Sequence, residues 1–410
     1  MRILIVNTLY YPDKTGGAEV SVQLLAESLV AQGHEVSVVC IARKRTSRVE
    51  SINGVNVYRI GLFNVYWPFD GRDKGVLARA AWHGLEMFNP VMIARLSAIV
   101  RDVAPDVVHT NNVHGFSTAI WAWLARRKLP IVHTIRDYAL LCSRGSLYRA
   151  GRRCESRCTD CRVLCTRKRI DSSHVSTVVG ISRHVLAEHL RHNWFAGRRN
   201  GAVVYNSVPA LPPGAKARAR DAGAPIVFGY IGRLVPEKGA RELLRAFNLL
   251  RARHPDVRLL VAGSGPDGFV ADLTRHAGPD VTLLGHVDAA RLYRDADVIV
   301  VPSLWDEPFG RTVAEALVFG RTVVCSNRGG LPELVTGRSH CRVFDADREE
   351  ALFDALEQVV AERRVTGASR NDDAEHEPIE RLFDPHAIAA RYVELYLRAV
   401  ELNAPLAERV

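Results

Sequence analysis

The amino-acid sequence predicts an α/β protein made of two similar domains, each built on a parallel sheet. Short β-branched runs alternate with amphipathic helical stretches, and this alternation occurs twice along the 410 residues. Alternation of this kind is typical of βαβ units, whose strands run parallel. A proline-rich stretch, residues 208–214, separates the two halves, and we interpret it as the linker. A chain of this length is expected to contain two or three domains.

The same patterns predict the individual elements. In the first half the predicted strands are Ile3–Asn7, Glu35–Cys40, Val55–Ile60, Val107–His109, Ile131–Thr134, Thr177–Gly180 and Ala202–Tyr205. In the second half they are Ile226–Ile231, Arg258–Ala262, Val281–Leu284, Val298–Val301 and Thr322–Ser326. The predicted helices include Glu19–Gln32, Ala240–Arg253, Thr312–Gly320 and Ala351–Arg363. We expect an N-terminal domain over residues 1–207, a C-terminal domain over 208–384, and a last helix, 385–410, that packs on the N-terminal domain. Residues 364–377 are polar and are predicted to form a loose loop.

The composition is that of a soluble globular protein, with 47% hydrophobic and 24% charged residues. No apolar run approaches the roughly 20 residues that span a bilayer. Residues 1–7 form a short apolar run without the longer core and cleavage site of a signal peptide, and we interpret them as a buried strand. The sequence therefore predicts a cytoplasmic protein.

Positive charge is concentrated in the first half of the chain. Residues 1–205 contain 29 Lys and Arg against 15 Asp and Glu, whereas residues 206–410 contain 26 against 30. The basic half is expected to meet an anionic partner, such as a membrane surface or a lipid phosphate, unless the chain is merely arginine-rich. No zinc-finger spacing with His, recognition-helix pattern or interleaved aromatic motif accompanies the basic residues, so nucleic acid is not an expected partner.

The most informative motif is the nonamer EPFGRTVAE, which places Glu307 and Glu315 eight positions apart. A predicted buried strand precedes it and a predicted helix follows, so the motif lies at the carboxyl end of a parallel strand. Ligands of open α/β sheets bind at this edge. Carboxylates there suit sugar and ribose hydroxyls, and the free amides at the helix start suit a phosphate.

Other strand ends of the second half also suit a ligand. Gly232 and Arg233 precede Lys238 on a loop that leads into a helix, where two cations can neutralise a diphosphate leaving group. The segments GSGP (263–266), GHV (285–287) and GGLPE (329–333) follow further strands. Each segment alone can be a plain turn, but five such strand ends in one domain favour a nucleotide-type ligand. The backbone near Val287 is expected to edge a nucleobase.

In the first half, a Gly-Gly turn and two histidines mark predicted strand ends. The segment GGAE (16–19) opens a helix after the first strand, which suits either an anion or a plain tight turn. It lacks the Gly-x-Gly-x-x-Gly fingerprint of dinucleotide sites, so an NAD site is not supported. The segments HTNN (109–112) and HTIRD (133–137) end two further strands. Two histidines at strand ends favour a functional role over a structural one.

Together these motifs resemble those of a known family. Over essentially its whole length the chain is similar to the retaining glycosyltransferases of family 4, whose GT-B fold has two Rossmann-like domains that face a cleft. The Glu307–Glu315 pair and the segment from Gly232 to Lys238 carry the resemblance most strongly, and GGAE and His109 match the acceptor-domain motifs. The resemblance implies transfer of a hexose from a UDP-, GDP- or ADP-linked donor with retention of configuration. It implies no cofactor or metal for catalysis.

The resemblance also implies roles for individual residues. Arg233 and Lys238 would stabilise the departing diphosphate, Glu307 would hold the hydroxyls of the transferred sugar, and Glu315 would hold the ribose. The two glutamates are therefore not interpreted as the acid and nucleophile of a glycosidase. The residues expected to act in catalysis are His109, Arg233, Lys238 and Glu307. Those expected to bind the donor are Gly16, Gly17, Gly232, Gly263, Val287, Pro308, Phe309, Gly310, Thr312 and Glu315. Those expected to bind the acceptor are Glu19, Thr110, Asn111, His133 and Arg136.

A cysteine-rich, basic insert at about residues 140–170 departs from the minimal family pattern. Cys154, Cys158, Cys161 and Cys165 follow Cys142, and disulfides are not expected in the cytoplasm. Two interpretations stay open: the last four thiolates hold a structural zinc ion, or a compact helical turn carries free cysteines.

Residues 126–169 contain 13 Lys and Arg against 3 Asp and Glu. We hypothesise that this segment touches an anionic membrane or a polyprenyl-diphosphate-linked glycan. Trp67, Phe69, Trp121 and Trp123 would supply apolar contacts, although the buried core is the alternative place for the last two. The protein would then be cytoplasmic and peripheral at the inner face of the plasma membrane.

The sequence thus predicts a hexosyltransferase that passes sugar from a nucleotide donor to a glycan or polyprenyl-linked acceptor in bacterial polysaccharide or cell-envelope assembly. One alternative is a sugar-nucleotide epimerase on the same scaffold, which would return an isomerised donor. The other is a non-catalytic basic scaffold for membrane or nucleic acid, which would not depend on Glu307 or Lys238.

Overall fold

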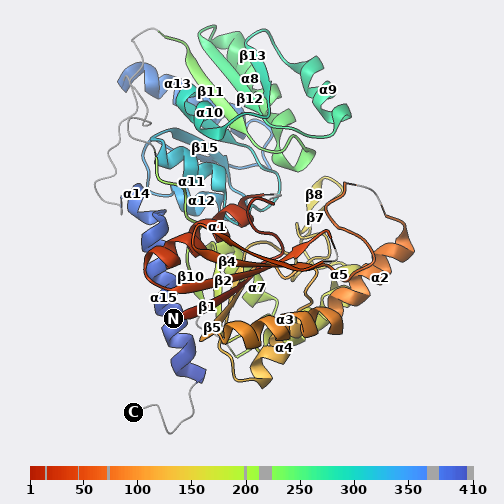
Figure 1. Cartoon of the computed structure of the whole chain (residues 1–410). Coiled ribbons are helices and arrows are strands. Elements are labelled where there is room, and N and C mark those ends of the chain that lie inside the picture. The colour runs from red at the N-terminus through yellow and green to blue at the C-terminus, as the bar shows by residue number, and fades with distance from the viewer. Residues whose placement is uncertain are drawn as a thin grey trace. The chain divides into compact units, whose positions relative to one another are not determined.

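The structure, a computed structural model, describes residues 1–13, 16–44, 46–71, 74–197, 201–211, 224–366 and 378–403 (Figure 1). The chain divides into two compact units. Unit 1 contains Met1–Gly145, Ser156–Pro209 and Phe383–Val410, and unit 2 contains Ser146–Glu155 and Ala210–Leu382. Each unit has a parallel or mainly parallel sheet, as the sequence predicts. Part of the predicted linker 208–214 and most of the predicted loop 364–377 lie outside the described residues.

Among its described residues, unit 1 has a sheet of eight strands in the order β10-β9-β6-β5-β1-β2-β4-β3. The strands are β1 (Arg2–Val6), β2 (Glu35–Ala42), β3 (Arg48–Ile52), β4 (Val55–Gly61), β5 (Val107–Thr110), β6 (Ile131–Ile135), β9 (Thr177–Gly180) and β10 (Ala202–Val203). The helices are α1 (Gly17–Ala31), α2 (Val76–Met87), α3 (Pro90–Val103), α4 (Ala119–Arg126), α5 (Thr159–Leu164), α6 (Thr166–Ser172), α7 (Arg183–Arg191) and α15 (Pro385–Asn403). The central strands are almost wholly buried, which explains their unbroken apolar runs.

The edge strand β3 is not among the predicted strands. Its residues are mostly polar and exposed, so it lacks the apolar run that marks the other strands. It pairs with β4 in antiparallel orientation because Asn53 and Gly54, both with positive φ, form a two-residue turn between Ile52 and Val55. An Asn-Gly turn is a strong hairpin signal, and that dipeptide could have revealed the strand.

The C-terminal helix α15 forms part of the core of unit 1. Ile388, Ala389, Tyr392, Tyr396 and Ala399 are buried in one cluster with side chains of α1 and of the central strands. These positions recur at three- and four-residue intervals, which places them on one face of the helix. Figure 1 shows α15, in blue, running beside α1. Burial of each large side chain stabilises this attachment by about 1.5–3 kcal/mol.

Within residues 224–366, unit 2 has a fully parallel sheet of six strands in the order β13-β12-β11-β14-β15-β16. The strands are β11 (Ile226–Ile231), β12 (Val257–Ala262), β13 (Val281–Gly285), β14 (Val298–Val301), β15 (Thr322–Ser326) and β16 (Arg342–Phe344). The helices of unit 2 are η1 (Pro236–Lys238), α8 (Ala240–Arg253), α9 (Asp267–His276), α10 (Ala289–Asp295), α11 (Arg311–Val318), α12 (Leu331–Val335), α13 (Ala351–Thr366) and α14 (Ile379–Leu382). The strand order reverses between β11 and β14, and such a switch point is where doubly wound sheets bind ligands.

Three short strands of unit 2 are not among the predicted elements. The edge strand β16 has three residues, too few for a recognisable pattern. The basic insert contains a small antiparallel hairpin, β7 (Tyr148–Arg149) and β8 (Arg152–Arg153), whose four residues include three arginines.

Within the described part of the chain, no helix combines the length and the apolar character needed to cross a bilayer.

Tyr396→Phe is expected to destabilise unit 1 while leaving its fold intact. The Tyr396 hydroxyl lies 2.7 Å from Nδ1 of the buried His109, and its removal leaves that nitrogen unpaired at a cost of about 1–3 kcal/mol. Urea denaturation followed by circular dichroism measures the change. The control is Leu397→Ala on the exposed side of the same helix, which should alter the free energy of unfolding by less than about 0.5 kcal/mol. Equal stability of Tyr396→Phe and wild type would contradict the expectation.

Candidate active site

An ion pair between the partly buried Lys238 and the buried Glu307 marks the switch point of unit 2. Glu307, on the loop after β14, accepts hydrogen bonds from Lys238 Nζ and from Ser303 Oγ, each at 2.6 Å on Oε1. The Ser303 carbonyl in turn accepts a hydrogen bond of 2.7 Å from Ser326 Oγ at the end of β15. The carboxylate of Glu307 is thus held by Lys238 and Ser303, and Ser326 at a third strand end fixes the Ser303 backbone.

The environment of Glu307 keeps this carboxyl group ionised. Burial by itself would raise its pKa, but the charge of Lys238 and hydrogen bonds from Lys238, Ser303 and Trp305 outweigh burial, so the pKa lies below its ordinary value. The Lys238 ammonium also lies 5.0 Å from the centre of the Trp305 ring. The pair is therefore a carboxylate beside an ammonium, with an aromatic wall.

The loops after β11 and β14 approach each other closely at Gly239. Its φ is +73°, and a Cβ atom at this position would lie 1.9 Å from the Pro302 carbonyl oxygen. A hydrogen bond of 2.9 Å from the Leu304 amide to the Glu237 carbonyl joins the same loops. Only glycine allows this approach, which brings Lys238 to Glu307.

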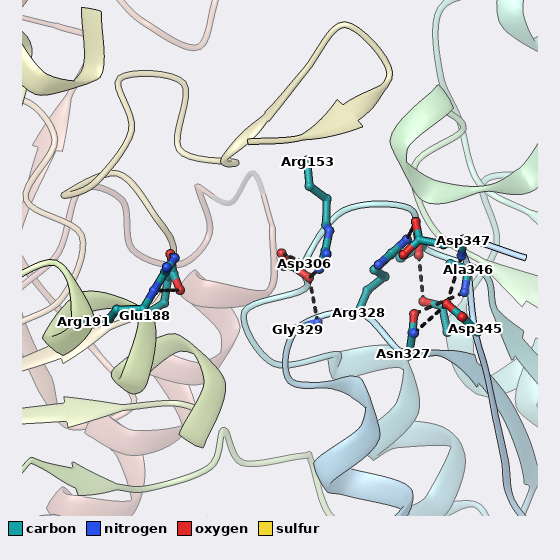
Figure 2. Close-up of polar contacts among 12 residues, drawn as sticks. Arg153, Glu188, Arg191, Asp306, Asn327, Arg328, Gly329, Asp345, Ala346 and Asp347 are labelled. Carbon is teal, nitrogen blue, oxygen red and sulfur yellow. Dashed lines mark hydrogen bonds and ion pairs between the residues drawn. The ribbon is translucent and has the colours of Figure 1, made fainter. Parts of the chain in front are cut away.

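Asp306 and Gly329 support the loop that carries Glu307 (Figure 2). Asp306 Oδ1 accepts hydrogen bonds from the Gly329 amide and from Arg153 Nη1, both at 3.1 Å. The Gly330 amide donates to the Glu307 carbonyl at 2.7 Å. A Cβ atom on Gly329 would lie 2.2 Å from that carbonyl oxygen, so a larger residue would displace the loop.

Asp306 and Arg153 are absent from the predicted site. Asp306 precedes Glu307 directly, and this adjacency is the one signal that could have revealed it. Arg153 lies on β8 in the insert. Residues Ser146–Glu155, which include β8, group with unit 2 although they are distant from Asp306 in sequence.

The second glutamate of the nonamer lies on α11. Glu315 accepts hydrogen bonds from the Tyr293 hydroxyl at 2.9 Å and from Arg311 Nε at 2.6 Å. Burial and the neighbouring Glu315 charge raise the pKa of Tyr293 well above 10, so its hydroxyl stays a donor. Neither Tyr293 nor Arg311 is among the predicted site residues, although the four-residue spacing of Arg311 and Glu315 is a recognisable helical pair.

The predicted donor residues of unit 2 follow neighbouring strands. Gly232, Gly263 and Val287 come after β11, β12 and β13, and hydrogen bonds link these strand ends: the Gly232 amide to the Ala262 carbonyl at 3.1 Å and the Gly263 amide to the Gly285 carbonyl at 2.7 Å. The remaining residues of this group occupy the turn into α11 and its first residues: Pro308, Phe309, Gly310 and Thr312. The exposed Arg233 lies directly after Gly232.

In unit 1 the structure corrects the position expected for His109. Its ring is fully buried, with Nδ1 2.7 Å from the Tyr396 hydroxyl and Nε2 2.8 Å from Thr134 Oγ1. Burial and the nearby Arg136 charge lower its pKa well below 6.5, so the ring is neutral. Because the hydroxyls of Tyr396 on α15 and Thr134 on β6 hydrogen-bond to the two ring nitrogens, His109 is enclosed in the core and not exposed beside a reacting sugar.

The other predicted residues of unit 1 divide between core and cavity. Asn111, His133 and Arg136 line a small cavity of about 30 Å³ at the ends of β5 and β6, and Arg136 Nε donates to Asn111 Oδ1 at 2.7 Å. Burial lowers the pKa of His133 to about 3, and its Nδ1 lies 3.0 Å from Oγ1 of the fully buried Thr110. Thr110 therefore belongs to the core.

The Gly-Gly turn of unit 1 opens α1. The Gly16 amide donates to the Glu19 carboxylate at 3.0 Å, and Gly17 is the first residue of the helix. Glu19 is 5% exposed, so the structure uses its carboxylate to satisfy a free amide at the helix start. Residues 14 and 15, directly before this turn, lie outside the described residues.

Two family models match the chain. "Glycosyl transferase 4-like domain" matches residues 16–207, and "Glycosyl transferases group 1" matches residues 225–362. The protein is a glycosyltransferase of the GT-B type.

Relatives of this GT-B glycosyltransferase include enzymes and proteins of unknown activity. An uncharacterized 42.6 kDa protein in the cps region of Klebsiella pneumoniae is 34% identical over 334 residues, which cover 82% of this chain and 87% of the relative. The D-inositol 3-phosphate glycosyltransferase of Corynebacterium glutamicum is 27% identical, with 94% and 92% covered.

Solved structures with the same fold cover nearly the whole chain. Sucrose-phosphate synthase from Thermosynechococcus elongatus has a TM-score of 0.70 at 21% identity, covering 97% of this chain and 98% of that structure. Anabaena HepE in complex with UDP and glucose has a TM-score of 0.63 at 18% identity, covering 96% and 99%. At these identities the similarity shows the fold alone.

The cysteines of the glycosyltransferase insert, all within the described residues, form no disulfide bond in the structure. Cys158 and Cys161 lie with their sulfur atoms 3.4 Å apart, and Cys161 is also close to Cys142. Among the described residues no group of three or more His, Cys, Asp or Glu side chains has the arrangement of a metal site. The zinc site at Cys154, Cys158, Cys161 and Cys165 stays a prediction.

Gly239→Ala is expected to destabilise unit 2 strongly. An alanine pays about 1–2 kcal/mol for the left-handed conformation alone, and its Cβ would also collide with the Pro302 carbonyl. Gly285→Ala is the matched control, because Gly285 also has positive φ (+66°) but has no atom within 4 Å of a built Cβ. Differential scanning calorimetry should show a Tm several degrees lower for Gly239→Ala than for Gly285→Ala. Equal losses would mean that the loops do not approach as described.

Proposed function

We propose that the protein is a retaining hexosyltransferase that uses a nucleotide-sugar donor. The observation that carries this proposal is the Lys238–Glu307 ion pair at the switch point of unit 2. A carboxylate with fixed position suits sugar hydroxyls, and an ammonium beside it suits a diphosphate.

Lys238 and Arg233 would bind the donor diphosphate. The Lys238 ammonium has three N–H donors, and Glu307 accepts one of them, so the others are free to turn toward a phosphate oxygen. The guanidinium of Arg233 is exposed on the loop after β11 and can form two parallel hydrogen bonds to phosphate. The two positive charges would stabilise the negative charge that develops as the diphosphate departs.

The nonamer would hold the rest of the donor. Glu307 would accept hydrogen bonds from hydroxyls of the transferred hexose, and Glu315 would accept them from the ribose. Each Glu315 oxygen already accepts one hydrogen bond, and a carboxylate oxygen can accept a second. The amides of Phe309 and Gly310, at the start of α11, would contact the sugar or a phosphate oxygen.

Transfer would retain the anomeric configuration. The bond from the sugar C1 to the diphosphate oxygen would break as the acceptor oxygen bonds to C1 on the same face. The acceptor proton would pass to the departing diphosphate oxygen. This step needs no protein nucleophile, and Glu307 would position the sugar throughout.

The acceptor would be a glycan or a lipid-linked glycan in polysaccharide assembly. The Klebsiella pneumoniae relative is a protein of the cps region, and the Corynebacterium glutamicum relative is named for transfer to an inositol phosphate. Asn111, His133 and Arg136, at the cavity of unit 1, would contribute to acceptor binding.

The test is a thermal-shift panel of UDP-, GDP- and ADP-sugars. A donor at a hundredfold its Kd should stabilise the protein by about 2.7 kcal/mol. Lys238→Ala should weaken this binding by roughly ten- to a hundredfold and slow transfer by about 10²–10³-fold, because one charged donor to the diphosphate is lost. Arg275→Ala, an exposed cation on α9, is the control and should behave as wild type.

Product analysis separates this proposal from its alternatives. Incubation with the stabilising donor and a lipid extract should release free nucleotide and leave the sugar on an acceptor. An isomerised intact donor would instead indicate an epimerase. Unchanged function in both Lys238→Ala and Glu307→Ala would indicate a non-catalytic scaffold.

We further propose that the basic segment 126–169 binds anionic lipid. Exposed arginines such as Arg149 and Arg152 would supply the charge. Of the four aromatic residues predicted to touch the membrane, Trp121 is fully buried and is excluded. Trp67 and Trp123 are half-buried and Phe69 is exposed, so these three are left as candidates for apolar contact.

Flotation with vesicles tests this association. Vesicles rich in phosphatidylglycerol should carry the protein at low salt and release it at high salt, since exposed charges are screened. Arg149→Glu with Arg152→Glu should weaken flotation, whereas Arg275→Glu, outside the segment, should have less effect. Binding that is absent, or insensitive to salt, would exclude the electrostatic association.

A further inference from the structure

A buried charged cluster lies at the ends of β5 and β6 in unit 1, and the proposed reaction does not use it. Its centre is Glu86 on α2, which is 4% exposed. The Glu86 carboxylate is hydrogen-bonded to His114 Nδ1, lies 3.4 Å from His83 Nδ1 and lies 3.8 Å from Lys168 Nζ. Lys168, on α6, is itself 7% exposed. Charges buried to this extent are costly, so their position calls for an explanation.

The cluster lines the small cavity that Asn111 also lines. Arg136 Nε donates to Asn111 Oδ1 at 2.7 Å, which identifies the other amide atom as the nitrogen. Asn111 Nδ2 is buried and has no hydrogen-bond partner among the described residues. An unpaired buried N–H is unfavourable, so this donor points to a missing acceptor atom.

The other groups around the cavity also present mainly donors. Among the described residues, His114 Nε2 has no protein partner, since the contact of this ring is through Nδ1 to Glu86. Lys168 Nζ donates to the Ala139 carbonyl at 3.0 Å and retains further N–H groups. Glu86 and Asp137 are the adverse charges. Glu86 is paired with His114 and Lys168, and Asp137 Oδ1 already accepts a hydrogen bond of 2.8 Å from the Ala139 amide.

We propose that this cavity binds an oxyanion group of the acceptor, through Asn111 Nδ2, His114 Nε2 and the Lys168 ammonium. The inference rests on the proposed glycosyl transfer, and it narrows the acceptor to one that carries a phosphate or a carboxylate. The cavity has a volume of about 30 Å³, which is enough for about two water molecules. Two oxygens of an anion can take the places of these waters.

Glu86 acts on this site as a positioning residue. Its charge and its hydrogen bond raise the pKa of His114 against the effect of burial, and the raised pKa favours the imidazolium form with Nε2–H as a donor. Burial alone would raise the pKa of Glu86, but the charges of His114 and Lys168 hold it well below 4.5. The charged groups that face His114 are thus Glu86 from α2, Lys168 from α6 and Asp137 from the loop after β6.

The test is calorimetric titration of the full chain with sodium sulfate, whose charge does not change near neutral pH. The double variant Arg233→Ala/Lys238→Ala serves as the background, because the proposed donor site would also bind sulfate. We expect binding in this background, weakened at least about tenfold by His114→Gln and unchanged by the exposed His174→Gln. Binding in the background should weaken as the pH rises through the pKa of His114, and His114→Gln should abolish that dependence.

Two further sets of measurements identify the anion and check that the variants are folded. Phosphate and glucuronate distinguish a phosphate-bearing acceptor from a carboxylate-bearing one, and glucose is the neutral comparison. Asn111→Asp keeps the shape of the side chain but replaces the unpaired N–H with an oxygen, so it too should weaken binding at least about tenfold. Circular dichroism confirms that both variants are folded.

The inference is overturned if no anion binds in the background, if glucose binds equally well, or if His114→Gln and Asn111→Asp bind as the background does. Sugar transfer from a nucleotide donor together with any of these results would leave the proposed function standing and remove only the anionic acceptor. Anion binding without any binding of a nucleotide sugar would leave the anion site standing and remove the proposed transfer from a nucleotide-sugar donor.

Discussion

The ion pair between Lys238 and the buried Glu307 depends on a close approach of two loops in unit 2, at Gly239 and Pro302. A buried pair contributes little net stability, because the loss of hydration offsets much of the attraction. Its loops are nevertheless built around it: Gly239 lies against the Pro302 carbonyl, and Gly329 lies against the Glu307 backbone. Such arrangements are better explained by the ligand that the pair would hold than by the stability of the sheet.

Unit 1 shows two different solutions for buried polar groups. His109 is neutral and finds partners for both ring nitrogens in neighbouring hydroxyls, so it belongs to the core. Glu86, His114 and Lys168 stay charged and border a cavity. The difference is whether every polar atom is already satisfied by the protein, and Asn111 Nδ2 is the atom that is not. Under the proposed function, that contrast separates the structural His109 from the acceptor site.

Most of the fold follows from local patterns. The apolar runs of β1, β5, β11 and β14 are buried strands, and the amphipathic stretches between them are helices. The strands that escaped prediction, β3, β16 and the β7–β8 hairpin, are short or polar, and they form through a turn or an edge position and not through an apolar run.

The sequence by itself determined the two parallel-sheet domains, the strand ends that carry Glu307, Lys238 and Gly232, and the family, because these depend on periodicity and on motifs of short range. Only the tertiary structure decided which polar residues are exposed to a ligand. His109 and Asn111 lie two positions apart in one segment, yet Tyr396, 287 residues further along, covers the first, while the second keeps an unpaired N–H at a cavity. Arg153 meets Asp306 across 153 residues. Burial and pairing of this kind depend on distant segments, whose contacts leave no local pattern in the chain.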